Sequence, residues 1–169
     1  METEYPDAPE AADATFRRAY CLEDLGQHKE ALKVVKKLEK SGRWSASDAL
    51  TLSLAQGIVE LRSGKRGKGI KRIVRALEGV ENSNAQTWIR SKARVALMRA
   101  QLNEAASLKL TCRWFTVRRL TARARLMAAA EAQARAAFRL GEPAYALEGL
   151  VLLGDAYVQL SRDMLEPPI

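Results

Sequence analysis

The sequence predicts an all-α fold in which antiparallel helix hairpins form a repeat array, an α-solenoid of about seven or eight helices. Three observations lead to this prediction. Residues that enter helices readily, such as Leu, Ala, Arg, Lys and Glu, dominate the chain, which holds only 10 Gly and 5 Pro. The long alternation of Val, Ile and Thr that is typical of strands is absent. Small residues also recur at a fixed spacing, which indicates repeated helix–turn–helix units.

The clearest case of this spacing lies in residues 55–77, where Gly57, Gly64, Gly69 and Ala76 follow one another at steps of seven, five and seven. Gly64 separates two apolar runs of helical period, so a helix, a tight turn and an antiparallel helix explain the pattern. Gly57 and Gly69 are expected to face each other across this hairpin, because small side chains let two backbones approach closely. The same spacing occurs three more times, at Ala19, Gly26, Ala31 and Leu38, at Ala93, Ala100, Ala105 and Cys112, and at Ala134, Gly141, Ala146 and Leu153.

Turn and capping residues divide the chain into four hairpins within one predicted domain, residues 1–169. Asp7 can cap the first helix, and Gly26, Gly64 and Gly141 are expected to form the turns of the first, second and fourth hairpins. The third hairpin has no turn glycine, and we expect it to break into two helices near residue 102. The hairpins are expected at about residues 8–40, 46–79, 85–115 and 118–163.

Helical periodicity also predicts which side chains form the core, because apolar residues three or four positions apart share one side of a helix. The predicted core residues are Leu22, Ala31, Val35, Leu54, Ile58, Ile70, Ile73, Leu97, Phe138, Leu147 and Leu150.

The net charge of +8 is unevenly distributed along the chain. Residues 62–75 hold seven basic side chains and no acidic one, and residues 105–140 hold eight basic side chains against Glu131 alone. Such asymmetry bears on partners and association rates rather than on the fold, and it favours acidic partners.

Two stretches resemble the turn and second helix of a tetratricopeptide repeat: LGQHKEALKVVKKL at residues 25–38 and LRSGKRGKGIKRIVRAL at residues 61–77. LGDAY at residues 153–157 is similar to the first-helix signature of that family. The repeat period here, 36 to 41 residues, exceeds the usual length of about 34, and the first-helix Trp and closing Pro are missing at their expected places. The C-terminal half therefore fits either a degenerate repeat or another helical hairpin array.

The resemblance implies a concave surface that binds peptides or partner helices. In the family register, Arg90 and Arg94 lie one turn apart on that surface, and Arg135 and Arg139 take the corresponding positions in the fourth copy. Arginine can hold a carboxylate through two hydrogen bonds, so these four residues are the predicted partner-binding site. A solvated basic helix face is the alternative interpretation.

The predicted function is a non-enzymatic scaffold or adaptor for protein–protein interaction, which binds an acidic peptide or partner helix in a basic concave groove. The alternative is a nucleic-acid-binding helical repeat module that uses the basic bands 62–75 and 105–140. Few aromatic residues and the lack of a known nucleic-acid motif make this alternative the weaker one.

No catalytic residue, cofactor or metal site is predicted. His28 is the only histidine, which leaves no histidine-based metal cluster or catalytic triad, and the basic run SGKRGKG at residues 63–69 lacks phosphate-loop spacing. No apolar run approaches the ~18–20 residues of a membrane span, and no apolar signal-peptide core follows the acidic N-terminus. We therefore expect no membrane span and a cytoplasmic location.

Overall fold

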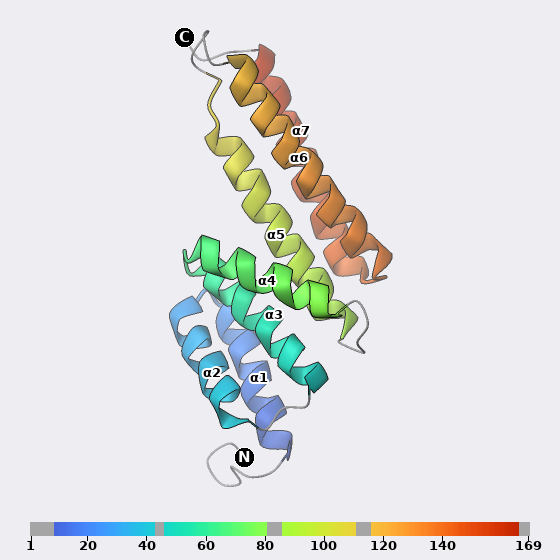
Figure 1. Ribbon diagram of the computed structural model, residues 1–169. Helices are drawn as coiled ribbons and strands as arrows, with labels where there is room; N and C mark the ends of the chain where they lie inside the picture. The colour runs from blue at the N-terminus through green and yellow to red at the C-terminus, as the bar shows by residue number, and fades with distance from the viewer. Residues whose placement is uncertain (1–8, 43–45, 81–85, 111–115, 166–169) are drawn as a thin grey trace. The chain divides into compact units, whose positions relative to one another are not determined.

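The computed structural model describes residues 9–42, 46–80, 86–110 and 116–165, which form seven α-helices and no strand (Figure 1). The helices are α1 (Pro9–Asp24), α2 (His28–Ser41), α3 (Ala46–Arg62), α4 (Arg66–Val80), α5 (Thr87–Ser107), α6 (Thr116–Arg139) and α7 (Pro143–Leu165). They pack as sequential antiparallel pairs, as the packing of α1 on α2, α3 on α4 and α6 on α7 shows. The all-α prediction is confirmed for the described residues. The predicted cap Asp7 lies outside them.

The chain forms two compact units, one of residues Met1–Ile89 and one of residues Arg90–Ile169. Unit 1 contains α1 to α4, and unit 2 contains α6, α7 and all of α5 beyond its first three residues. The single domain stays a prediction.

Glycine makes the hairpin turns that the sequence predicts. Gly26, Gly64 and Gly141 have φ angles of 76°, 87° and 75°, in the left-handed region that costs other residues free energy. In the turn after α3, the amide of Lys65 donates to the carbonyl of Glu60 at 2.9 Å, which closes the C-terminal end of that helix. The chain can therefore reverse within two or three residues and pair each helix with the next.

The α3–α4 hairpin is held at close range by Gly57 and Gly69, as predicted. A Cβ added to Gly69 would lie 2.6 Å from the amide nitrogen of Leu61 and 2.7 Å from the carbonyl oxygen of Gly57. A Cβ added to Gly57 would lie 2.6 Å from Cγ1 of Ile73. Two helix backbones are thus in direct contact at a point where no side chain fits between them.

A buried carboxylate strengthens the same hairpin. Glu60 of α3 is fully buried, and it accepts from Nε of Arg72 at 3.2 Å and lies 3.4 Å from Nζ of Lys68, both on α4. A second buried carboxylate, Glu23 of α1, lies 2.8 Å from Nη1 of Arg62 on α3. These cations compensate charges that would otherwise be costly to bury.

The core of unit 2 joins α5, α6 and α7. Met98 and Leu102 of α5 pack with Met127 and Ala130 of α6, and side chains of α7 such as Leu153 close the cluster. The predicted break near residue 102 is wrong, because α5 continues to Ser107. Its apolar face simply runs on past the expected turn, since both Leu102 and Ala105 are buried in this core. The end of the predicted third hairpin, residues 111–115 with Cys112, lies outside the described residues.

The predicted core is correct for six residues, all in α2 to α5: Ala31, Val35, Leu54, Ile58, Ile73 and Leu97. Leu22 and Ile70 are half-buried. The prediction is wrong for Phe138, Leu147 and Leu150, which are 66%, 64% and 58% exposed. These three residues lie on α6 and α7, whose apolar surface exceeds what the described residues of unit 2 cover.

Candidate functional site

The hairpin of α6 and α7 carries a groove between its two helices, which we call the α6–α7 groove. Its volume is about 390 Å³. The lining residues recur every three or four positions on each helix, so they share one side of it. They are Glu131, Ala134, Arg135, Phe138 and Arg139 of α6 and Ala146, Leu150, Leu153 and Tyr157 of α7.

The local sequence explains why this hairpin forms. The amides of Leu140 and Gly141 donate to the carbonyls of Ala137 and Phe138, each at 3.1 Å, and Gly141 then reverses the chain. Pro143 opens α7, where its fixed φ suits the first helical turn and its missing N–H costs nothing. The tight turn leaves the exposed ring of Phe138 at the end of α6, beside the groove.

The groove has an apolar floor and a charged rim. Ala134, Ala146 and Leu153 line the floor, whereas the guanidinium groups of Arg135 and Arg139 are exposed at its edge. Arg135 donates from Nη1 to Oε2 of Glu131 at 3.3 Å, and no described carboxylate pairs with Arg139. The rim therefore has a positive charge that an acidic partner could neutralise.

One polar pair closes the groove at the end away from the turn. The hydroxyl of Tyr157 donates to Oε1 of Glu131, joining α7 to α6. This hydrogen bond to a carboxylate, more than burial, raises the pKa of Tyr157 above its ordinary value. The phenol therefore remains a hydrogen-bond donor to a higher pH than an ordinary tyrosine.

The apolar surface extends from the groove over the solvent side of α7. We call this side the outer face of α7, defined by Leu147, Val151, Gly154, Val158 and Leu165. All five residues are exposed, and a Cβ added to Gly154 would meet no atom within 4 Å. Contiguous exposed apolar surface on a helix is typical of an interaction site.

The structure brings two of the four predicted partner-binding residues into the groove. Arg135 and Arg139 line it together. Arg94 instead lies on α5, where Nη1 donates to Oε1 of Gln133 on α6 at 3.0 Å, and the half-buried Arg90 lies one turn earlier. Neither Arg90 nor Arg94 lines the groove. Sequence reasoning missed Phe138, Leu150 and Tyr157 as groove residues, although the nearly continuous apolar sequence of α7 was a signal.

Several side chains of the two basic bands form ion pairs or hydrogen bonds within the protein. In residues 62–75, Arg62, Lys68 and Arg72 compensate buried carboxylates. In residues 105–140, Arg123 is buried against Asp163, and Arg119 donates to the backbone carbonyl of Lys109. Charge counted along the sequence thus overstates the charge available to a partner.

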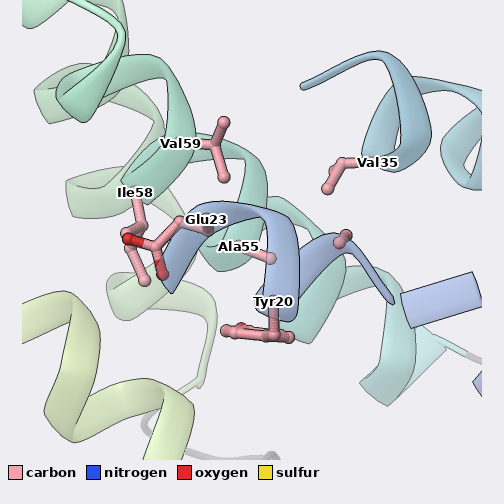
Figure 2. Close-up of a pocket in the computed structure, with 7 residues that line it drawn as sticks. Tyr20, Glu23, Val35, Ala55, Ile58 and Val59 are labelled. Atoms are coloured by element: carbon pink, nitrogen blue, oxygen red, sulfur yellow. The ribbon is translucent and has the colours of Figure 1, made fainter. Parts of the chain in front are cut away.

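A smaller cavity in unit 1 lies between α1, α2 and α3 (Figure 2). Tyr20 and Glu23 of α1 border it with Val35 of α2 and with Ile58 and Val59 of α3. Its volume of about 10 Å³ corresponds to a single water molecule at most. This cavity is too small for an organic ligand, so of these two the α6–α7 groove is the candidate site.

Other kinds of site find no support in the described ranges. Nowhere in them do three or more His, Cys, Asp or Glu side chains come together so as to hold a metal ion. Among the described helices, none combines the length and apolar character that a membrane crossing requires. Comparison of the chain with protein-family models, with curated proteins and with solved structures finds no match.

Proposed function

We propose that the chain is a non-enzymatic scaffold or adaptor, whose α6–α7 groove binds an acidic peptide or helix of another protein. The exposed ring of Phe138 carries this proposal. It lies in an apolar groove between two exposed arginines, Arg135 and Arg139. Aromatic and arginine side chains in such a setting are the residues that contribute most to protein interfaces.

The shape of the groove suits a helical partner. From Ala146 to Tyr157 its α7 wall spans twelve residues, a rise of about 16 Å, which matches about three turns of a partner helix. Apolar side chains of the partner at positions i, i+3 or i+4, and i+7 fill the floor. An acidic side chain beside them reaches the arginine rim. LGDAY at residues 153–157 of α7, which is similar to the first-helix signature of tetratricopeptide repeats, supports the same function.

Apolar contacts supply most of the affinity in this proposal, and the arginines supply orientation and speed of encounter. Exposed charges steer association more than they raise affinity, and salt weakens them. Reversal of Arg94 is a poor test, because Arg94 bridges to Gln133 inside unit 2 and its loss would disturb packing. The groove arginines are exposed, so their reversal leaves the fold intact.

The test uses a labelled amphipathic peptide with leucines at i, i+3, i+4 and i+7 and flanking glutamates, and a second peptide in which lysines replace the glutamates. Fluorescence anisotropy at low and high salt measures their binding to the wild type and to the double variant R135E/R139E. The matched control is R118E/R125E, which makes the same charge change on exposed α6 positions outside the groove.

We expect the wild type to prefer the acidic peptide and R135E/R139E to bind it about tenfold more weakly at low salt, a loss of about 1.4 kcal/mol. F138A should weaken both peptides, because the exposed aromatic side chain of the groove is lost. Equal binding of the acidic and basic peptides, or an equal loss in R118E/R125E, would refute the groove as the site.

A further inference from the structure

Five lysines lie along one side of α2 in unit 1. Lys29, Lys33, Lys36, Lys37 and Lys40 follow one another at steps of three or four residues, apart from the adjacent pair, and all are exposed. With 3.6 residues per turn, these steps put them in one row. The opposite side of the helix is buried in the core and includes Ala31, Val35 and Leu38. The row is therefore the outermost side of α2.

A second basic row follows on α4, where Lys68, Lys71 and Arg75 are exposed at steps of three and four residues. Arg72 connects the two helices, since its Nη1 lies 3.6 Å from Oε1 of Glu39 on α2. Both α2 and α4 pack on α3. Because each basic row lies opposite the buried side of its helix, both rows of unit 1 face solvent.

We call this combined surface the lysine face, and its members are Lys29, Lys33, Lys36, Lys37, Lys40, Lys68, Lys71 and Arg75. The exposed acidic side chains of α2 and α4 are Glu30, Glu39 and Glu78, and Glu39 already faces Arg72. Within the described ranges, Lys68 is the one member with an ion pair, to Glu60. The face therefore carries a clear excess of uncompensated positive charge.

We propose that the lysine face binds the phosphate backbone of double-stranded nucleic acid without reading its base sequence. Lysines that neutralise phosphates release condensed counterions, and this release drives binding. The row from Lys29 to Lys40 rises about 16 Å, against one phosphate charge per ~1.7 Å of duplex axis. Each lysine of the row thus has several phosphates within reach.

The composition of the face argues for a duplex over other polyanions. Binding of single strands relies on aromatic side chains that stack on bases, and neither α2 nor α4 contains Phe, Tyr or Trp. Helices that bind at a membrane surface insert apolar side chains, whereas those of α2 are buried within unit 1. This function is independent of the α6–α7 groove, which lies in the other unit.

The experiment compares the wild type with K29Q/K33Q/K36Q/K40Q, which removes four charges from the lysine face. The control variant K109Q/R118Q/R125Q/R162Q removes four charges from exposed positions of unit 2 outside the α6–α7 groove, so the net charge of the two variants is equal. Probes are labelled short duplexes of two unrelated sequences, the matching single strands, and vesicles containing phosphatidylserine. Circular dichroism checks the helix content of both variants.

We expect the wild type to bind both duplexes alike, with an affinity that falls on the order of 10³-fold between about 50 and 200 mM salt. In the α2 variant the slope of log affinity against log salt should shrink by about three to four units, because four phosphate contacts are lost. The control should keep the wild-type slope. The fourfold Lys→Arg variant of the same α2 positions should also bind, since it retains the charge.

Three results would overturn the proposal. Equal losses in both glutamine variants would show that net charge, rather than this face, governs binding. Tighter binding of single strands than of duplexes would point to stacking elsewhere on the chain. Binding to the vesicles without binding to duplexes would assign the lysine face to an anionic membrane.

Discussion

At the scale of single residues, Arg123 is a charged side chain in an environment that its type does not suggest. It is 2% exposed on α6, and its Nη1 donates to Oδ2 of Asp163 on α7 at 2.5 Å. This hydrogen bond lowers the pKa of Asp163, and the hydrogen bond from Gln159 acts in the same direction. Because the carboxyl is easier to ionise in the folded chain than in the unfolded one, the pair stabilises the fold above the ordinary Asp pKa. That contribution is lost as the pH falls through the lowered value.

The first prediction is that D163N destabilises the chain in a pH-dependent way. At pH 7 the variant should lose about 3 kcal/mol in its free energy of unfolding, because a buried guanidinium is left without its counter-charge. Urea titrations from pH 7 down to pH 3 should show this gap narrowing at the acid end, because the unfolded wild-type chain takes up a proton at Asp163 more readily than the folded chain, in which the pKa is lowered. D155N is the control, an exposed aspartate on the same helix that should change the free energy of unfolding little. A gap that stays constant over the whole range would contradict the role assigned to the pair.

Residue type does not distinguish Arg123 from the exposed arginines near it. Arg118, Arg123 and Arg125 belong to one basic band, and residue type alone places all three in solvent. Only the packing of α7 on α6 buries the middle one and brings Asp163, forty residues away, within hydrogen-bonding distance. The same limit applies to Arg94. Its predicted role assumed a concave binding surface, whereas in the structure its guanidinium group donates to Gln133 of α6.

At the scale of elements, the α3–α4 hairpin shows how much of a hairpin can be predicted from residues close together in the sequence. Spacing alone predicted the turn at Gly64 and the contact of Gly57 with Gly69, because turn glycines and small residues leave a pattern within a few helical turns. The course of α5 was predicted wrongly, with a break near residue 102. The residues around Asn103 include no glycine and no other residue that ends a helix. There the continuation of the helix is decided by Leu102 and Ala105, which pack on another helix.

The second prediction ranks glycine substitutions in this hairpin. G69A should destabilise by about 2–3 kcal/mol, because its new methyl group meets backbone atoms of Leu61 and Gly57 that cannot move apart alone. G57A should cost less, about 1 kcal/mol, because the clash is with the side chain of Ile73.

Thermal and chemical unfolding of both variants provides the measurement, with G67A as the control. Gly67 lies in the same helix, and a Cβ added there meets nothing within 4 Å, so alanine should be neutral or stabilise by up to about 1 kcal/mol. If G69A proved as mild as G67A, the two backbones would not be in contact at that point.

At the scale of the whole molecule, α6 and α7 expose more large apolar side chains than the other described helices. Phe138, Leu147 and Leu150 were predicted to be buried because apolar periodicity signals a face that needs a partner. Periodicity does not say whether that partner belongs to the same chain. In unit 2, α5 and α6 cover one side of α7, and the opposite apolar side is left to solvent.

The third prediction is that this surface controls association and contributes little to folding. The variant L147Q/V151Q/V158Q should keep the melting temperature of the wild type within a few degrees, because the replaced side chains are already exposed. It should bind less of a dye that reports exposed apolar surface and should associate less at high concentration, as light scattering would show. A large fall in melting temperature would mean that the outer face is covered in the folded chain.

The Arg123–Asp163 pair also limits how α6 and α7 can slide along each other. Both helices are rich in Ala and Leu, so a shift of one turn, about 5.4 Å, would exchange one set of apolar contacts for a similar one. Such a shift would place Gln159, which is neutral, where Asp163 now compensates the buried guanidinium. The misaligned hairpin would then contain an unpaired interior charge, a penalty that apolar contacts of equal area do not offset. The ion pair thus opposes such a shift together with the tight turn at Gly141 and the hydrogen bond from Tyr157 to Glu131.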